Sequence, residues 1–386
     1  MKKKAIVIGA GIVGLGIARA LSIKGFEVLV IEKNSFAIGA SIRNFGMVWP
    51  VGQPEGELYE RALLTKSIWL ELCKEANIWF DPVGSLHLAY SDLEMQVLES
   101  FYDKVAVNRK YSLLQSSQTL RLSSAIVSSG LRGSLFSPDE MIVDSPKAIK
   151  ALANLLSEKY GVQFMWDSHV NAVQTDKVWV GNRIIECDEI FVCTGPDFEN
   201  LFPEIFSKFP ITKCKLQMMR MPVQPDHWKL GPSLCGGLSL THYSSFRLAG
   251  DILNKLKEYY QSTLPNHVEW GIHVMVSQNS TGELIIGDSH EYGLTHDPFD
   301  KGFVNQFILD YLKTFARFQN EEISYQWNGT YAKMADGATE LVVQPVEGVT
   351  IVNGLGGAGM TLALGLTYQV VNGMVPIKKV EGFKSL

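Results

Sequence analysis

The N-terminal segment contains a glycine pattern that few folds can accommodate. Residues 4–8 form an apolar run without alternation, which predicts a short buried parallel strand. The sequence G-A-G-I-V-G follows at once at positions 9–14, and residues 12–24 have helical spacing. Residues 27–31 predict a second strand, which ends at Glu32. A strand, a G-x-G-x-x-G turn, a helix and a second strand in this order predict a Rossmann-like unit that binds a dinucleotide.

Each glycine of this turn has a physical role. Gly9 permits a tight turn after the strand, Gly11 lets the backbone approach a pyrophosphate, and Gly14 lets the helix pack closely on the strand. The helix begins at Ile12 and Val13, where unpaired N–H groups and the positive end of the helix dipole can face the phosphates. The alternative is a glycine turn that arose by chance, and the flanking strands and helix argue against it.

The acidic residue after the second strand narrows the choice of dinucleotide. A carboxylate at Glu32 can accept hydrogen bonds from both hydroxyl groups of a ribose, and it would repel a 2′-phosphate. This residue favours FAD or NAD over NADP. The motif alone does not choose between FAD and NAD.

Two further segments favour FAD. Residues 33–46, K-N-S-F-A-I-G-A-S-I-R-N-F-G, resemble the segment after the second strand in the glycine and D-amino-acid oxidase family of flavoproteins, where it runs along the pyrophosphate toward the flavin. Residues 349–354 predict a strand, and G-G-A-G-M-T at 356–361 begins an apolar helix. In the same family such a segment closes the site over the flavin, and its dipole end would stabilise negative charge on the reduced ring. The alternative for the first segment is a polar loop, and the alternative for the second is a helix start with a flexible loop. Together the two segments disfavour an enzyme that uses NAD alone.

The resemblance implies which residues contact FAD. The segment 190–196 is a buried strand ending in Thr-Gly that returns beneath the cofactor, backbone groups of Val170 bind the adenine, and Gly46 gives room beside the isoalloxazine ring. FAD is expected to be non-covalent, because some family members attach flavin through a cysteine in the 310–340 region and this chain has no cysteine after Cys235. The implied FAD-binding set is Gly9, Gly11, Ile12, Val13, Gly14, Glu32, Lys33, Ser41, Arg43, Asn44, Gly46, Val170, Thr194, Gly195, Gly356, Gly357, Gly359, Met360 and Thr361.

The resemblance covers nearly the whole chain and implies an α/β fold with an α+β second domain. A discontinuous Rossmann-like FAD-binding domain would be joined to an antiparallel-sheet substrate domain that caps the flavin. Alternating residues within 83–90 and 211–290 favour an antiparallel sheet with one open face, and helical spacing occurs at 57–76, 92–106 and 303–318. The expected boundaries are 1–82, 140–210 and 325–386 for the FAD-binding domain, and 83–139 and 211–324 for the substrate domain.

The reaction class follows from the same resemblance. Residues 43–50, R-N-F-G-M-V-W-P, resemble a narrower subgroup that is suspected of oxidising aminophosphonates related to 2-aminoethylphosphonate. The leading interpretation is FAD-dependent oxidation of a small amine or amino acid, by oxidative deamination or N-dealkylation, with hydride transfer to flavin N5. Oxygen or another acceptor would then reoxidise the flavin. One alternative changes the substrate to glycine, sarcosine or a D-amino acid, and another is a flavin-binding subunit without its own catalysis.

Few side chains are needed for such a reaction, and no general base is assigned. A carboxylate or phosphonate on the substrate needs cationic, hydroxyl or imidazole donors. For Lys333 a cavity position and a solvated position are equally supported, whereas a structural role is favoured for His273 and a surface salt bridge for Arg220. His242 and Tyr243 are expected in a strand. The candidates for substrate binding are Lys333, His273, Tyr243, His242, Tyr331, Arg220 and Arg247.

Composition and charge argue against several other classes of protein. The net charge is −5, and the basic run at 2–4 is too short for a phosphate-binding surface, so no nucleic-acid partner is expected. The five cysteines are odd in number and none forms C-x-x-C, which predicts no disulfide framework and no metal site, and fits a cytoplasmic location. The lysines and the apolar stretch after them resemble a secretory signal, but glycines interrupt the stretch, and no membrane span is expected.

Overall fold

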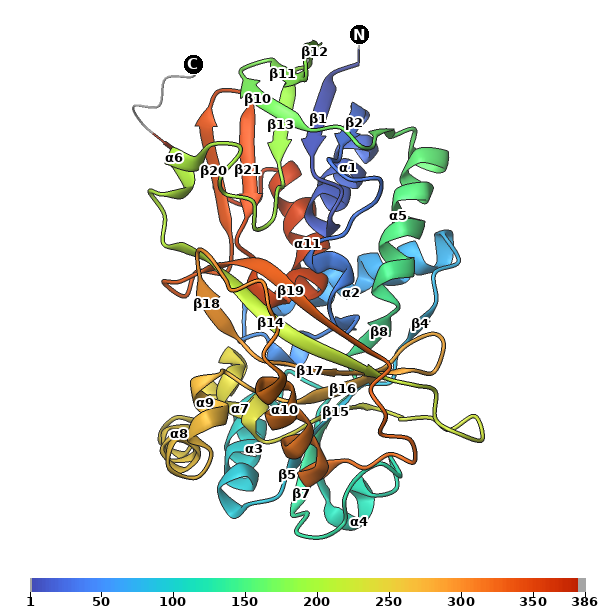
Figure 1. Cartoon of the computed structure of the whole chain (residues 1–386), viewed down its shortest axis with the longest axis vertical. Coiled ribbons are helices and arrows are strands. Elements are labelled where there is room, and N and C mark those ends of the chain that lie inside the picture. The colour runs from blue at the N-terminus through green and yellow to red at the C-terminus, as the bar shows by residue number, and fades with distance from the viewer. Residues whose placement is uncertain (1, 381–386) are drawn as a thin grey trace.

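The computed structural model describes residues 2–380, which form two layered halves. The upper half in Figure 1 contains the first and last strands, β1 and β22, in a mainly parallel sheet, and the lower half contains a larger, mainly antiparallel sheet. The mixed α/β class expected from the sequence is confirmed. None of the helices within residues 2–380 has both the length and the apolar character needed to span a bilayer.

The sheet of the upper half has seven strands, in the order β22-β20-β21-β13-β1-β2-β9. β1 lies near its middle and pairs in parallel with β2 and β13, so that Val7 is opposite both Val30 and Phe191. β20 is the antiparallel exception, beside β21. The bounds are β1 (Lys4–Ile8), β2 (Glu27–Ile31), β9 (Gln163–Met165), β13 (Glu189–Val192), β20 (Leu341–Val346), β21 (Val349–Asn353) and β22 (Lys378–Lys379).

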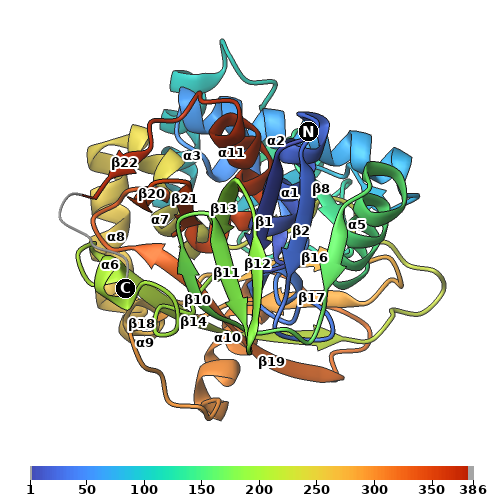
Figure 2. The same ribbon diagram turned by 90° about the horizontal axis from the view of Figure 1, so that it is seen from above.

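Both faces of this sheet are covered, which explains why its strands are apolar without alternation. Ala5 and Val7 pack in the helical layer, whereas Ile6 and Ile8 pack in the layer of the small sheet on the opposite face. Figure 2 shows these layers on either side of β1. The helical layer consists of α1 (Ile12–Ile23), α2 (Glu57–Glu75), α5 (Ser145–Tyr160) and α11 (Gly359–Val371), and the small sheet of β10 (Val170–Gln174), β11 (Lys177–Val180) and β12 (Arg183–Glu186).

The sheet of the lower half has nine strands, in the order β18-β14-β17-β16-β15-β5-β7-β6, with β19 also paired to β14. All neighbours are antiparallel except β15 and β5. The bounds are β5 (Ser85–Ala89), β6 (Ser112–Gln115), β7 (Gly133–Ser137), β14 (Ile211–Met221), β15 (Ser233–Cys235), β16 (Met275–Gln278), β17 (Leu284–Gly287), β18 (Glu291–Gly293) and β19 (Tyr325–Met334).

Helices pack on this sheet around a core that includes Phe101, Phe246 and Phe315. The predicted helices at 57–76, 92–106 and 303–318 correspond to α2, α3 and α10. The strand-rich interpretation of 211–290 missed three helices between β15 and β16, because the short strands on either side dominate the pattern. The helices are α3 (Asp92–Val105), α4 (Ser116–Thr119), α7 (Leu238–His242), α8 (Asp251–Thr263), α9 (Pro265–Glu269) and α10 (Gly302–Phe315).

Short elements complete the chain and link the halves. A small three-stranded sheet has the order β3-β8-β4. Along the chain, its strands lie between elements of the two larger sheets. These elements are β3 (Met47–Val48), β4 (Phe80–Asp81), β8 (Met141–Val143), α6 (Pro203–Phe206) and the 3₁₀ turns η1 (Ala40–Ile42), η2 (Pro50–Gly52), η3 (Ser244–Ala249) and η4 (Gly356–Ala358).

β19 departs from the boundary expected at residue 325. It pairs with β14 from Tyr325 opposite Arg220 to Met334 opposite Ile211, so it belongs to the nine-stranded sheet. At its end Lys333 forms an isolated bridge with Leu355, next to the C-terminal glycine loop. A long strand is therefore shared between the halves, and sequence patterning of a strand alone does not identify its partner.

Candidate active site

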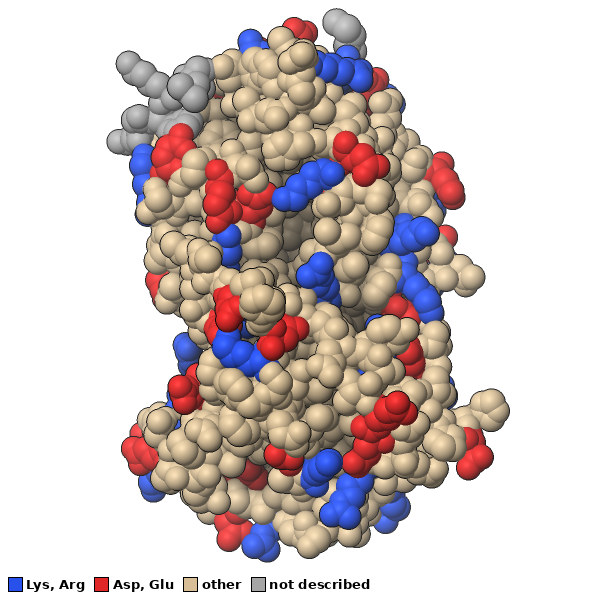
Figure 3. All heavy atoms as spheres, in the orientation of Figure 1, with Lys and Arg blue, Asp and Glu red and all other residues tan. Residues whose placement is uncertain are grey.

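A cavity of about 690 Å³ lies where the two halves meet. The turn after β1 and the loop before α11 line it from the upper half, and side chains of β14, β16 and β19 line it from the lower half. Figure 3 shows a hollow on this face between the two halves, with Lys or Arg side chains beside it. Segments far apart in the sequence therefore build one elongated site.

The turn after β1 is closed around its glycines. Gly9 has a φ of +104°, and a Cβ there would lie 2.5 Å from the carbonyl oxygen of Cys193. A Cβ on Gly14 would lie 1.9 Å from the carbonyl oxygen of Gly9, so α1 packs directly on the turn. Gly11, Ile12 and Val13 line the cavity, which places the N-terminus of α1 at its wall.

The carboxylate of Glu32 lines the cavity at the end of β2 and also holds the neighbouring loops. It accepts hydrogen bonds from the backbone N–H groups of Ala10, at 2.9 Å, and Asn34, at 3.0 Å. The hydroxyl of Ser41 accepts one from the N–H of Ile12 at 2.9 Å. Both side chains thus order the turn from the side of the cavity.

A second helix N-terminus opens on the same cavity. Gly356 and Gly357, in η4, and the first residues of α11 line it. The hydroxyl of Thr361 accepts a hydrogen bond from the N–H of Trp49 at 2.9 Å, which ties α11 to the segment before η2. Two positive dipole ends therefore face one space from opposite ends of the chain.

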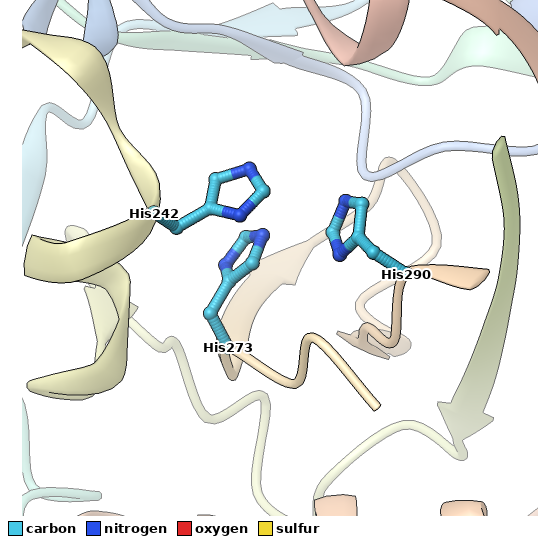
Figure 4. Close-up of side chains that lie close together, drawn as sticks. All are labelled: His242, His273 and His290. Atoms are coloured by element: carbon cyan, nitrogen blue, oxygen red, sulfur yellow. The ribbon is translucent and has the colours of Figure 1, made fainter. Parts of the chain in front are cut away.

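The far end of the cavity holds a cluster of three histidines, His242, His273 and His290 (Figure 4). One nitrogen of each ring lies within 4.8 Å of the others. Asp288 adjoins the cluster, with its Oδ1 3.2 Å from Nε2 of His273 and its Oδ2 3.9 Å from Nε2 of His290. The backbones of His273 and Asp288 exchange two hydrogen bonds, so the connection between β16 and β17 brings these residues together.

Burial keeps the imidazoles of this cluster neutral. Removal from water is the main cause that holds the pKa of His242 and of His273 well below the ordinary value, and the neighbouring imidazoles add to it. The same cause lowers the pKa of His290 to about 4 and raises the pKa of the Asp288 carboxyl well above its usual range. His242 is exposed and lines the cavity, whereas His273 and His290 are buried.

Comparison with known proteins identifies the family. The family model described as FAD dependent oxidoreductase, abbreviated DAO, matches residues 4–370. The chain belongs to this family. It is an FAD-dependent oxidoreductase, as the resemblance in the sequence indicated.

Curated relatives of this oxidoreductase are distant and in part much longer. A glycerol 3-phosphate dehydrogenase of Caloramator mitchellensis is 30% identical over 187 residues, which cover 46% of this chain and 38% of the relative. A polypeptide of the opine oxidase of Rhizobium meliloti is 22% identical over 346 residues, covering 86% of this chain and 82% of the relative. The chain spans only 38% and 36% of the first two relatives it matches.

Solved structures share the fold over nearly the whole chain. The glycine oxidase of Geobacillus kaustophilus superposes with a TM-score of 0.77 at 16% identity, covering 100% of this chain and 99% of that one. The iminodiacetate oxidase of Chelativorans sp. BNC1 gives 0.72 at 18% identity, covering 99% and 98%.

The residues of the cavity fit FAD. Any side chain on Gly9 or Gly14 would collide with backbone. The glycines therefore let the turn pack closely, as the turn that binds a pyrophosphate at a helix N-terminus requires. Of the implied FAD-binding set, all but Gly14 and Gly46 line the cavity. Gly14 acts through helix packing, as the sequence indicated.

Gly46 lies in a different environment from most of this set. Its missing side chain faces Val143, because a Cβ there would lie 2.0 Å from that carbonyl oxygen, and it does not line the cavity. Asn44 is engaged locally: its amide donates to the carbonyl of Ala40, and its oxygen accepts from Gly46 and Ser145. These bonds shape the loop, which sequence spacing does not show.

The remaining cofactor-side residues are tied together around the cavity wall. Arg43 donates to the carbonyl of Asn328 at 3.2 Å, and Lys33 forms a 2.7 Å ion pair with Asp197. Val170 is buried at the start of β10, and Thr194 and Gly195 follow β13.

Most of the candidates for substrate binding line the cavity, including Tyr243, Tyr331 and Arg247. Lys333 does so beside the C-terminal glycine loop, where its Cγ lies 3.5 Å from the position of a Cβ on Gly356. Its Nζ donates to the hydroxyl of Tyr292 at 3.0 Å, and burial lowers its pKa. Lys333 is thus partly buried and lies at the cavity wall.

Arg220 does not join the other candidates for substrate binding. It lies outside this cavity in a 3.3 Å ion pair with Glu283, which agrees with the salt bridge that the sequence favoured. The strand expected for His242 and Tyr243 was wrong. His242 ends helix α7 and Tyr243 follows it, so neither lies in a strand. The helix is too short for its periodicity to be recognised.

His290 and Asp288 were missed in the sequence. They follow the strand 284–287. A hairpin between that strand and 275–278 places Asp288 opposite His273, and the N–H of His290 donates to the carbonyl of Trp270. The alternation of D-S-H at 288–290 was the available signal, since residues two apart in an extended segment share a face.

Proposed function

We propose that this FAD-dependent oxidoreductase oxidises a small amine that carries an anionic group. The observation that carries the proposal is the continuity of the cavity. One cavity is lined by the turn after β1, by the loop before α11 and by the polar side chains of the histidine cluster. FAD, when bound, supplies a two-electron acceptor for hydride transfer.

Apolar parts of the cavity wall favour the neutral form of an amine. Phe45 and Met275 are buried residues that line the cavity, and Met218 lies beside them. An ammonium group placed there loses hydration, which lowers its pKa and frees the lone pair that assists hydride transfer. The chain therefore needs to orient the substrate rather than supply a strong base.

Lys333 and Tyr331 are the side chains proposed to bind the anionic group. Both lie on β19 and face the C-terminal glycine loop, with the hydroxyl of Tyr331 3.3 Å from the position of a Cβ on Gly357. An ammonium and a hydroxyl are suitable donors for a carboxylate or phosphonate. This arrangement would hold the substrate at the flavin.

Within this class, we propose amino acids and aminophosphonates as the substrates. Glycine oxidase and iminodiacetate oxidase among the structural neighbours support an amine by their names. The segment 43–50 supports an aminophosphonate, because Arg43 and Trp49 from it line the cavity. The five free, buried cysteines support a reducing compartment such as the cytoplasm.

An anaerobic screen of flavin reduction tests the proposal. Glycine, sarcosine, D-alanine, 2-aminoethylphosphonate and its N-methyl derivative are added to the oxidised protein, and bleaching of the flavin absorbance is followed. Ethylamine serves as the control without an anion, and glycerol 3-phosphate as an alcohol. Bleaching by an anionic amine is expected. Bleaching by the alcohol alone would contradict the amine assignment, and no bleaching at all would favour a non-catalytic flavin-binding protein.

A further inference from the structure

The histidine cluster has the spacing of a metal site. The ring centroid of His242 lies 3.8 Å from that of His273 and 4.5 Å from that of His290. The three rings converge from α7, from the segment before β16 and from the segment before β18 (Figure 4). A ligand at their centre would need to contact three imidazoles at once.

The contacts of the histidine rings leave ring nitrogens available to a cation. A metal ion binds an imidazole through the free lone pair of a ring nitrogen. The Nδ1 of His290 lies 3.0 Å from the carbonyl oxygen of Gly271, which makes it the N–H donor and leaves Nε2 with a free lone pair. A backbone carbonyl that orients a histidine in this way is typical of metal ligands.

Polar atoms at the cluster lack partners. Nδ1 of His273 and Oδ1 of Asp288 have no hydrogen-bond partner among the described residues. The side chains of these two residues are only 4% and 7% exposed. Such atoms are costly to bury unless something binds them, so they indicate a missing ligand. Imidazole nitrogens and a carboxyl oxygen gather at this point, and a transition metal ion is a ligand that suits such donors.

We propose that His242, His273 and His290 hold a divalent transition metal ion such as Zn²⁺ at the far end of the cavity. Three nitrogen ligands and an open position are a donor set that Zn²⁺ accepts. Asp288, beside His273 and His290, orients the ligands and balances the charge. This site departs from the sequence-based expectation of no metal, which considered cysteine spacing.

The metal has a consequence for the reaction. His242, His273 and His290 all line the cavity, so a metal ion held by them would lie at its wall. The ion would bind the anionic group of the amine and supply positive charge that neutral imidazoles lack. This consequence rests on the proposed function, whereas metal binding does not.

Metal counting tests the site without turnover. The flavin-loaded protein is treated with a chelator, dialysed and titrated with Zn²⁺, and bound metal is measured by mass spectrometry. One Zn²⁺ per chain is expected. The variants His273→Ala and His290→Ala should weaken binding by about 100-fold or more, since even changes around metal ligands cost about 10–100-fold. His227→Ala, which removes an exposed histidine outside the cluster, should bind as tightly as the wild type.

The outcomes separate metal from anion binding. Retention of flavin identifies folded variants, and His290→Gln provides a replacement of closer size. Absence of bound Zn²⁺ in the wild type, or equal binding by the cluster variants, would overturn the proposal. Binding of inorganic phosphate to the chelator-treated protein, abolished by His273→Ala and independent of Zn²⁺, would instead make the cluster an anion site. If the protein binds Zn²⁺ but none of the amines reduces its flavin, the proposed function is refuted and the metal site is not.

Discussion

At the scale of single residues, Glu140 is a carboxyl group with no exposed surface. It accepts hydrogen bonds from the N–H of Val51 and the hydroxyl of Ser85, both at 2.9 Å. Burial outweighs these bonds and raises its pKa from 4.5 to about 7. The folded protein therefore retains a proton that the unfolded chain releases at lower pH.

Ionisation of Glu140 should contribute to the pH dependence of the free energy of unfolding. A raised folded-state pKa means that the free energy of unfolding falls as the pH rises from 4.5 to about 7. The Glu140→Gln variant lacks this loss, so its stability relative to the wild type should increase by about 2–3 kcal/mol between pH 5 and pH 8. Urea denaturation at the two pH values, at equal FAD concentration, measures it. Parallel pH profiles for the two proteins would contradict the raised pKa.

Lys333 is the residue whose role in substrate binding is most directly tested. The Lys333→Met variant removes a charge-assisted hydrogen bond worth about 1.5–3 kcal/mol, so KM for the anionic amine should rise about 10–100-fold. Most of its stem is kept, and its partner Tyr292 is 51% exposed and can bond to water instead. Steady-state kinetics beside Lys208→Met, an exposed control, measure the effect. An unchanged KM would return Lys333 to a structural role.

At the scale of elements, the contact between α1 and the turn before it is the tightest constraint on the cofactor side. The Cβ of alanine at position 14 would lie 1.9 Å from the carbonyl oxygen of Gly9 and 3.4 Å from Cγ1 of Val7. Only a shift of the helix relieves this overlap. Because the N-terminus of α1 lines the cavity, such a shift also moves the groups that face the phosphates.

The Gly14→Ala variant should therefore lose both stability and cofactor. Overpacking of this kind costs about 1–3 kcal/mol, and FAD affinity should fall with it. Gly302→Ala is the matched control, since Gly302 begins α10 and a Cβ there meets nothing within 4 Å. The control should be unchanged or more stable by about 1 kcal/mol. Thermal unfolding and flavin fluorescence measure both effects, and a fully FAD-loaded, stable Gly14→Ala protein would contradict them.

At the scale of the whole molecule, the cavity lies between the two halves and takes residues from both large sheets. FAD bound in this cavity would contact both halves. A ligand that binds the folded state alone stabilises it in proportion to the logarithm of its concentration. The free energy of unfolding of both halves should therefore rise with the concentration of free FAD.

Non-covalent binding gives this dependence a measurable form. Acid denaturation and filtration should release the flavin into the filtrate, because no cysteine follows Cys235. Free FAD at 100 times its dissociation constant should add about 2.7 kcal/mol to the free energy of unfolding. Flavin that remains with the precipitated protein would show a covalent bond.

Local elements could be recognised in the sequence because their signals are local. Strand 4–8, the glycine turn and strand 27–31 match β1, the start of α1 and β2 almost to the residue. Their periodicity, glycine positions and chain order need no knowledge of distant partners. The C-terminal loop at 356–361 was recognised for the same reason.

Three features depend on residues that are distant in the sequence. They are the surroundings of Gly46, the helix that ends at His242 and the pairing of β19 with β14. A side chain's neighbours across a sheet are set by register, which sequence spacing within one strand does not specify. Expectations for these residues failed or were incomplete on that account.

The sequence by itself determined the cofactor and the family, because a pyrophosphate site is built from consecutive residues around a helix N-terminus. Only the tertiary structure brought His242, His273 and His290 together, from an α-helix and two segments beside strands. The reason is physical: a phosphate-binding turn uses backbone groups of one segment, whereas a side-chain cluster requires the chain to fold before its members meet. The side chains available to bind a substrate or a metal ion in the cavity were therefore shown only by the tertiary structure.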